Sequence, residues 1–257
     1  MDLNLDGRKA IVTGASRGIG LAIARLLADE GVDIAFCARA RSGVDAAVVD
    51  LQARGVRVFG ESVDVVDAAR YVDWLHSAVA QLQGVDIFVH NVTASPSTAG
   101  LAGWDLNYRT DMLGAVLGVD TLTQYLRQST GAAIVLIASI SGVMSKVLPA
   151  PGAYSYGSLK AALIAYGAQI SKDLAKEGIR VNMVSPGPIY FPGGPWDRVQ
   201  QVAPQLMESA RQACVIGRLG EPQDIANAVA FLASPRSGFT VGQNLQIDGG
   251  FMQHVAF

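Results

Sequence analysis

The sequence has few of the residues on which cross-links and metal sites depend. Its 257 residues include only two cysteines and three histidines. Cys37 lies in the apolar run 34–38, which favours a small buried thiol over a disulfide partner. The histidines His76, His90 and His254 show none of the paired spacings of a metal site. We therefore predict a reducing, cytoplasmic compartment and no catalytic metal.

An excess of charge of either sign is also missing. The 20 Lys+Arg and 22 Asp+Glu give a formal net charge of −2, which excludes the basic surface of a nucleic-acid binder. The amino-terminal residues are acidic, unlike a signal peptide, and the uncharged stretches contain too many Ser, Thr and Gly residues to span a bilayer. We predict no nucleic-acid or membrane partner.

What the sequence does contain is an alternation of short β-rich apolar runs with longer segments of helical periodicity. This alternation predicts an α/β fold: a single-domain, Rossmann-type, doubly wound parallel sheet of seven strands flanked by helices, over residues 1–257. The expected strands are 10–13, 33–38, 57–63, 86–90, 133–137, 180–184 and 244–247. The expected helices are 18–30, 44–54, 66–81, 101–127, 154–177 and 223–233.

The first expected strand runs into a glycine-rich turn, Thr13-Gly14-Ala15-Ser16-Arg17-Gly18-Ile19-Gly20, and then into a helix. Glycines at these spacings allow a tight turn, let the backbone approach a pyrophosphate and let the helix pack close to the sheet. The helix N-terminus would supply amide donors to the anion. The same residues could form a tight turn that binds nothing. Their position between strand and helix favours a dinucleotide site.

The second expected strand ends in Phe36-Cys37-Ala38-Arg39, without the carboxylate that would bind the ribose hydroxyls of NAD(H). Arg39, together with Arg17 from the glycine-rich turn, could instead bind a 2′-phosphate. We therefore predict that NADP(H) is preferred and that NAD(H) is possible. The alternative is that both arginines are solvated surface residues.

Tyr156 and Lys160 stand at the start of the expected helix 154–177, where the i, i+4 spacing places both on one helix face. An ammonium held beside a phenol stabilises the phenolate, so such a tyrosine can exchange a proton near neutral pH. Surface helices also produce this spacing by chance. Its position after the fifth expected strand makes it a candidate acid/base pair.

These motifs occur in order with Arg180-Val181-Asn182-Met183-Val184-Ser185-Pro186-Gly187-Pro188-Ile189 and Asp248-Gly249-Gly250, and the chain resembles the short-chain dehydrogenase/reductase family over essentially its whole length. The resemblance implies an oxidoreductase that interconverts a carbonyl and an alcohol by hydride transfer. Tyr156 would be the general acid/base, Lys160 would hold the nicotinamide ribose, and Ser139 would polarise the carbonyl.

The resemblance also implies further cofactor contacts. They are Asp64, Val65, Asn91, Pro186, Gly187 and Ile189. Asp64 could equally be a strand-end cap, Asn91 a loop hydrogen-bonder and Ile189 a core aliphatic residue.

Several positions depart from the family pattern. The usual Asn-Asn-Ala-Gly stretch reads His90-Asn91-Val92-Thr93, which adds bulk at the floor of the nicotinamide site. Asp111 stands where the family commonly has an asparagine of its proton relay, and it completes the predicted catalytic set. It could also be a helix polar residue beside Asn107. An ionised Asp111 offers only acceptors and opposes a phenolate at Tyr156, so we expect it to tune the pH dependence.

Two further departures concern the substrate side. Ser139 lies further before Tyr156 than the family's serine does, which fits an enlarged loop at 144–151 and leaves Ser141 as a competitor. The threonine that the family has beside the cofactor's carboxamide is replaced by the run Tyr190-Phe191-Pro192.

The segment at about 187–215 is the predicted substrate lid. It contributes Tyr190, Phe191 and Trp196, and the site is also approached by Met144, Leu148 and Tyr154. This inventory favours an apolar or aromatic carbonyl or alcohol substrate, unless the aromatic residues pack on the core instead.

The last expected strand and the apolar tail 251–257 resemble the family's two-fold interface. We therefore predict a homotetramer, with a dimer as the alternative; the tail could also fold back on its own subunit. Two rival functions remain open, an NAD(H)-dependent alcohol or diol dehydrogenase and a dinucleotide-binding regulator without turnover. The presence of both Tyr156 and Lys160 argues against the regulator.

Overall fold

The computed structural model describes residues 2–94, 98–145, 150 and 152–253. Seven strands form one sheet in the order β3-β2-β1-β4-β5-β6-β7, and all neighbours are parallel. Their bounds are β1 Lys9–Thr13, β2 Asp33–Ala38, β3 Val58–Ser62, β4 Ile87–His90, β5 Ala132–Ile137, β6 Ile179–Pro186 and β7 Asn244–Ile247. The predicted doubly wound sheet is confirmed.

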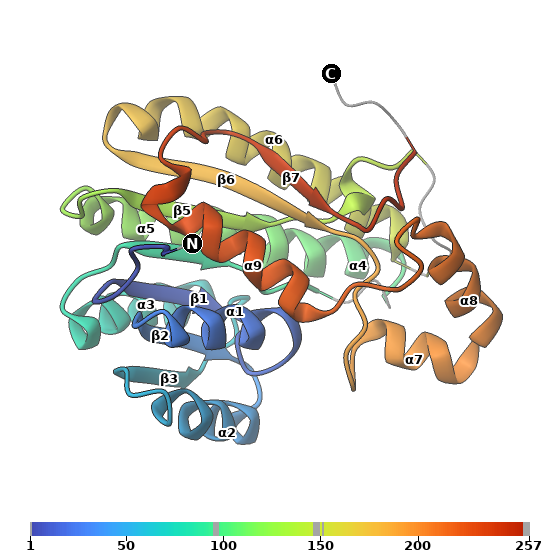
Figure 1. Cartoon of the computed structure of the whole chain (residues 1–257), viewed down its shortest axis with the longest axis horizontal. Helices are drawn as coiled ribbons and strands as arrows, with labels where there is room; N and C mark the ends of the chain where they lie inside the picture. The colour runs from blue at the N-terminus through green and yellow to red at the C-terminus, as the bar shows by residue number, and fades with distance from the viewer. Residues whose placement is uncertain (1, 95–97, 146–149, 151, 254–257) are drawn as a thin grey trace.

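Helices cover both faces of this sheet (Figure 1). One face carries α1 (Gly18–Asp29), α2 (Arg41–Gln52) and α9 (Pro222–Ala233), and the other carries α3 (Ala68–Leu82), α5 (Gly114–Leu126) and α6 (Ala153–Lys176). The remaining helical elements are α4 (Gly100–Asn107), η1 (Tyr108–Leu113), η2 (Ile140–Gly142), α7 (Pro195–Val202), α8 (Pro204–Ala213) and η3 (Pro235–Ser237). In Figure 1, α7 and α8 project beyond the layers at the right.

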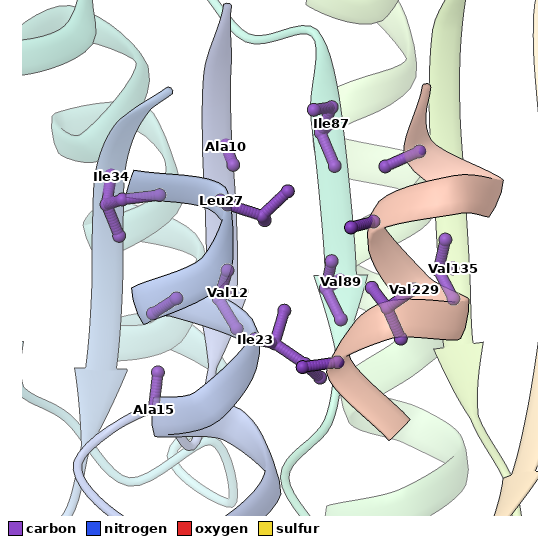
Figure 2. Packing of buried hydrophobic residues seen from close by; sticks show 14 of the residues in the cluster. Ala10, Val12, Ala15, Ile23, Leu27, Ile34, Ile87, Val89, Val135 and Val229 are labelled. Carbon is purple, nitrogen blue, oxygen red and sulfur yellow. The ribbon is translucent and has the colours of Figure 1, made fainter. Parts of the chain in front are cut away.

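The strands are apolar at consecutive positions because helices cover both faces of the sheet. In β1, Ala10 and Val12 face the cluster under α1 and α9, while Ile11 faces the cluster on the opposite side. Successive strand side chains point to opposite faces, so each of these positions must be apolar. Figure 2 shows Ile23 of α1 and Val229 of α9 over the same face of the central strands.

Two expected elements are divided in the structure. The expected helix 101–127 consists of α4, the π-helical turn η1 and α5. The lid segment contains two helices, because Pro204 lacks a backbone N–H and disfavours helical geometry at Ala203, whose φ is −149°. The π-helical turn leaves no mark in the apolar periodicity because it lasts a single turn.

The strand order reverses between β1 and β4, and in open α/β sheets ligands bind in the crevice at the carboxyl ends of the strands beside such a reversal. The predicted site residues cluster at this end. Cys37 and Cys214 are buried free thiols, and burial raises the pKa of Cys37 to about 12. Within the described ranges, no helix combines the length and hydropathy needed to cross a membrane.

Candidate active site

The glycine-rich turn is braced from β4. The Asn91 amide donates to the carbonyl oxygens of Thr13 at 3.0 Å and Gly14 at 3.2 Å, and the Asn91 N–H donates to Thr13 Oγ1 at 3.0 Å. A Cβ on Gly20 would lie 2.4 Å from the Gly14 carbonyl oxygen and 2.5 Å from the Asn91 amide nitrogen. Gly20 is therefore required for packing, and the Asn91 side chain braces the glycine-rich turn.

The start of α1 fits an anionic group. Arg17 is the N-cap residue with an extended backbone, and its side chain does not cap the helix. No side chain among the described residues caps the first-turn N–H groups of α1, so these groups are available to an anion such as a pyrophosphate. Gly18 and Ile19 open this turn and are half-buried. The residues present fit the phosphates of a dinucleotide.

Two arginines were expected to converge near the end of β2. Arg39 follows β2 and is exposed, which fits both a 2′-phosphate contact and a solvated surface arginine. Arg17, in contrast, donates from Nη1 to the carbonyl oxygen of Gly193 at 3.0 Å, which ties the glycine-rich turn to the 187–215 segment. Asp64 is exposed, and its Oδ1 accepts from the N–H of Val66 at 3.1 Å, while the intervening Val65 is buried.

The start of the 187–215 segment packs on the glycine-rich turn. The Phe191 ring lies over Gly18, where a Cβ would come within 2.6 Å of Cζ of the ring and where φ is +55°. Tyr190 Oη donates to Asp197 Oδ1 at 3.1 Å, and this bond raises the pKa of Tyr190. Asp197 Oδ2 also accepts from the Gly193 N–H at 2.9 Å. Asp197 therefore organises the loop, a role that no motif had indicated.

The turn after β6 forms the other wall. Gly187 follows Pro186 and donates its N–H to the carbonyl oxygen of Ile247 at 2.9 Å, and a Cβ on Gly187 would lie 2.6 Å from the Asp248 Cα. Ile189 is 5% exposed and packs in the core. Trp196 and Met144 are half-buried and Tyr154 is 79% exposed. Leu148 and tail residues 254–257 lie outside the described residues.

Lys160 lies at the centre of the candidate site, one helical turn after Tyr156 in α6. Its ammonium is 5.8 Å from the centroid of the Tyr156 ring, so the two side chains share a helix face as predicted. Nζ donates to the carbonyl oxygen of Ile137 at 2.8 Å and pairs with Asp111 Oδ1 at 2.9 Å. Both charged side chains are only 1% exposed.

Asp111 reaches this site from the π-helical turn η1. Besides Lys160, its Oδ1 accepts from Thr93 Oγ1 at 2.5 Å, and its Oδ2 accepts from the Ala94 N–H at 3.1 Å. Asn107 plays a separate, structural part, because its amide donates to Ser155 Oγ at 2.9 Å and so ties α4 to α6. The carboxylate of Asp111 thus faces the candidate catalytic lysine.

His90 lies beside this ion pair at the end of β4. Its side chain is fully buried, and neither ring nitrogen has a hydrogen-bond partner within the part of the chain that the structure describes. Burial, and next the positive charge of Lys160, lowers the pKa of His90 to about 4. His90 is therefore neutral near pH 7, which agrees with the packed residue expected at a strand end.

Ser139 follows β5 closely and is 8% exposed. Its Oγ accepts from the Ser141 N–H at 3.1 Å and caps η2. A Cβ on Gly142 would lie 2.7 Å from the backbone nitrogen of Ala161, so η2 packs directly on α6 next to Lys160. Ser139 is thus buried at the strand end, and Ser141 is half-buried within η2.

Known proteins are similar to this chain over nearly its whole length. A family model described as enoyl-(acyl carrier protein) reductase matches residues 14–252. Isoepoxydon dehydrogenase of Penicillium expansum is 31% identical over 249 residues, which cover 96% of this chain and 95% of that protein. The 3-oxoacyl-(acyl-carrier-protein) reductase of Staphylococcus epidermidis is 33% identical over 249 residues, with coverages of 95% and 98%.

A solved structure extends this similarity to the whole fold. L-sorbose reductase from Gluconobacter frateurii, in complex with NADPH and L-sorbose, superimposes with a TM-score of 0.91. It is 31% identical, and the match covers 99% of this chain and 100% of that one.

Proposed function

The chain belongs to the short-chain dehydrogenase/reductase family, and we propose that it is an NADP(H)-dependent enzyme that interconverts a carbonyl compound and an alcohol, with Tyr156 as the general acid/base. As a member of this family it is an oxidoreductase that acts on alcohols or carbonyls with a nicotinamide dinucleotide. The buried ammonium of Lys160, 5.8 Å from the Tyr156 ring centroid, is the observation that carries the assignment of Tyr156.

The side chains divide the chemistry between them. When bound, the nicotinamide supplies or accepts the hydride. During reduction Tyr156 gives its phenolic proton to the substrate oxygen, and during alcohol oxidation its phenolate takes that proton back. The Ser139 hydroxyl donates to the same oxygen and stabilises its developing charge. Lys160 would hold the nicotinamide ribose and stabilise the phenolate, and Asp111 acts on the reaction through Lys160.

The cofactor would extend along the carboxyl ends of the strands. The glycine-rich turn and the start of α1 would hold its phosphates, and Asp64, Val65, Asn91, Pro186, Gly187 and Ile189 are the remaining proposed contacts. Exposed Arg39 and the absence of an acid at the end of β2 support NADP(H) over NAD(H). L-sorbose reductase, similar over the whole chain, was solved with NADPH.

A cofactor titration tests this preference. We expect Arg39→Glu to weaken NADPH binding by about 10- to 100-fold and NADH binding far less, since a charge-assisted hydrogen bond contributes roughly 1.5–3 kcal/mol. Fluorescence titration of both cofactors measures the ratio. Arg25→Glu, on the α1 surface where Arg25 pairs with Asp50, is the control. Equal losses for both cofactors would favour the NAD(H)-dependent alternative.

Replacing the phenol separates an enzyme from a dinucleotide-binding regulator. We expect Tyr156→Phe to lower kcat by a factor of at least about 100 on a panel of apolar ketones and aldehydes, because general acid catalysis is lost, while NADPH still binds. Tyr166→Phe, in the same helix and half-buried, is the matched control. Cofactor binding without turnover of the wild-type protein on any panel member would favour the regulator.

Three coarser features complete the proposal. Residues 1–257 form one domain in which residues 187–215 are the substrate lid, tied to the glycine-rich turn by Arg17 and Phe191. Tyr190 and Trp196 in the lid support an apolar substrate. The buried free thiols support a reducing, cytoplasmic location.

We also propose a homotetramer that uses the β7 edge of the sheet. Within the part of the chain that the structure describes, β7 pairs with β6 on one side and with no strand on the other. Phe239 before β7 is fully exposed, and Leu245 within it is 37% exposed. Apolar side chains beside an open strand edge support an interface between copies of the chain.

A further inference from the structure

Two positions that depart from the family pattern meet in one hydrogen bond. Thr93 Oγ1 donates to Asp111 Oδ1 at 2.5 Å, and the same oxygen pairs with Lys160 Nζ at 2.9 Å. The residues come from separate elements: the loop after β4, the π-helical turn η1 and α6. A residue without a hydroxyl at position 93 could not make this bond, and an amide at position 111 would carry no charge to pair with Lys160.

The donors around Asp111 explain how a carboxylate can be buried there. An ionised carboxylate at 1% exposure is costly unless it is paired and its oxygens accept further hydrogen bonds. Asp111 receives three donors: the Lys160 ammonium, the Thr93 hydroxyl and the Ala94 N–H. Thr93 is the only neutral side chain among them. Its hydroxyl therefore helps to determine where the carboxylate lies.

The network leaves Lys160 with little freedom. An ammonium has three N–H donors, and Asp111 and the Ile137 carbonyl oxygen use two of them. Among the described residues no further acceptor takes the third N–H, which is available to a cofactor ribose. The opposite charge of Asp111 also weakens the positive field of Lys160 at the Tyr156 ring.

Contacts among the described residues place four titratable groups at this site. From α6 it is faced by Lys160 and Tyr156, from η1 by Asp111 and from β4 by His90. His90 is neutral near pH 7 and adds no charge there. Thr93 carries a hydroxyl that does not titrate in this range. The charge beside Tyr156 is therefore set by the Lys160–Asp111 pair.

We propose that Thr93 is a positioning residue of this enzyme: its hydroxyl holds the Asp111 carboxylate against Lys160, and the resulting pair sets the pH at which Tyr156 becomes a phenolate. This inference rests on the proposed role of Tyr156. Loss of the Thr93 hydroxyl lets the carboxylate turn away from Lys160, so the ammonium is less neutralised and the phenolate forms at lower pH. Loss of the carboxylate charge has the same effect and a larger one.

Phenolate formation can be followed without a substrate. Ultraviolet difference titration of each protein against its Tyr156→Phe counterpart isolates the ionisation of Tyr156. We expect Thr93→Val to shift this titration downward by about half a pH unit and Asp111→Asn to shift it downward by about one unit. In the Asp111→Asn background, Thr93→Val should add no further shift, because its acceptor is no longer charged.

Matched variants separate this role from general destabilisation. Thr93→Ser keeps the hydroxyl and should restore the wild-type titration even if Thr93→Val folds poorly. Asp105→Asn removes an exposed acid of α4 that pairs with Arg109, and it should shift nothing. Equal titrations for Thr93→Val, Thr93→Ser and wild type would overturn the proposal, as would additive effects of Thr93→Val and Asp111→Asn.

Cofactor binding and turnover distinguish failure of this proposal from failure of the proposed function. The protein could bind NADPH and show Tyr156-dependent turnover while Thr93→Val leaves the titration unshifted. That result would reject the role of Thr93 and keep the enzyme assignment. The titration could instead shift as expected in a protein that turns over no substrate. That result would support the role of Thr93 and reject Tyr156 as the general acid/base of an enzyme.

Discussion

The buried residues at this site differ in whether their polar side-chain atoms have hydrogen-bond partners. Asp111 accepts hydrogen bonds from Thr93 and Ala94 besides its ion pair with Lys160. His90, buried beside them, has no hydrogen-bond partner for either ring nitrogen among the described residues. A buried charge with partners can persist, whereas a buried base without partners stays neutral. We therefore expect the free energy of unfolding to depend on pH through the protonation of His90.

We predict that His90 makes the protein less stable in mild acid. Its pKa is about 4 in the folded protein and 6.5 in the reference state, so the unfolded chain binds the additional proton as the pH falls through this window. The stability that the neutral ring contributes is complete above about pH 6.5 and is lost toward pH 4. Between pH 7 and pH 5 the loss is on the order of 2 kcal/mol.

Urea unfolding of His90→Asn at pH 7 and pH 5 measures this contribution. Between pH 7 and pH 5 the free energy of unfolding of the variant should fall by about 2 kcal/mol less than that of wild type, whatever its value at pH 7. His76→Asn is the control, because His76 is exposed and, among the described residues, its ring hydrogen-bonds Tyr125 Oη alone. If the free energy of unfolding falls equally for His90→Asn and wild type between pH 7 and pH 5, groups other than His90 cause the loss.

The sequence predicted where single residues lie better than it predicted which residues they pair with. It placed Tyr156 and Lys160 on one helix face because an i, i+4 spacing fixes that geometry locally. The pairing of Lys160 with Asp111 depends on how η1 and α6 pack, which no local pattern encodes. For the same reason the sequence did not reveal that Arg17 would contact Gly193.

At the scale of elements, the predictable part of the fold is the part governed by burial. Strands covered on both faces must be continuously apolar, so all seven were recognisable. The turn η1 was not, because a single π-helical turn is too short to be recognised in the apolar pattern. The lid helices α7 and α8 were also hidden, since α7 has no buried residue and α8 buries only Ala210.

Because α7 and α8 bury so little, their attachment depends on a few loop contacts. The Phe191 ring on Gly18 and the Arg17 bond to Gly193 are two of these. We predict that Phe191→Ala increases local opening of the lid and that trypsin cleaves at Arg198 or Arg211 several times faster. The loss of one buried contact of about 1 kcal/mol would raise the open population about fivefold.

Time courses of limited proteolysis, with fragments identified by mass, test this expectation. Val202→Ala in the same segment is the control, because Val202 is 72% exposed and its truncation removes no buried contact. NADPH should slow cleavage if the cofactor adds contacts to the lid. Equal cleavage rates for Phe191→Ala and wild type would show that Phe191 does not hold the lid.

At the scale of the whole molecule, the sheet topology explains why residues distant in sequence meet. The reversal of strand order between β1 and β4 leaves a crevice at their carboxyl ends, where the glycine-rich turn, Asn91 and the Lys160–Asp111 pair all lie. An open sheet also has two edge strands, here β3 and β7. An edge strand exposes unpaired backbone groups and invites pairing with another chain.

The β7 edge is where we expect copies of the chain to associate. Phe239 is fully exposed there and Leu245 is 37% exposed, so burial of both between subunits would be favourable by a few kcal/mol. We predict that wild type sediments as a tetramer and that Phe239→Asp reduces it to a dimer, because a carboxylate at the centre of an apolar contact would be desolvated without a partner. Val49→Asp on α2, where Val49 is 70% exposed, introduces the same charge next to the β3 edge and should leave the tetramer intact. A tetramer that survives Phe239→Asp, or one that Val49→Asp disrupts instead, would move the interface away from β7.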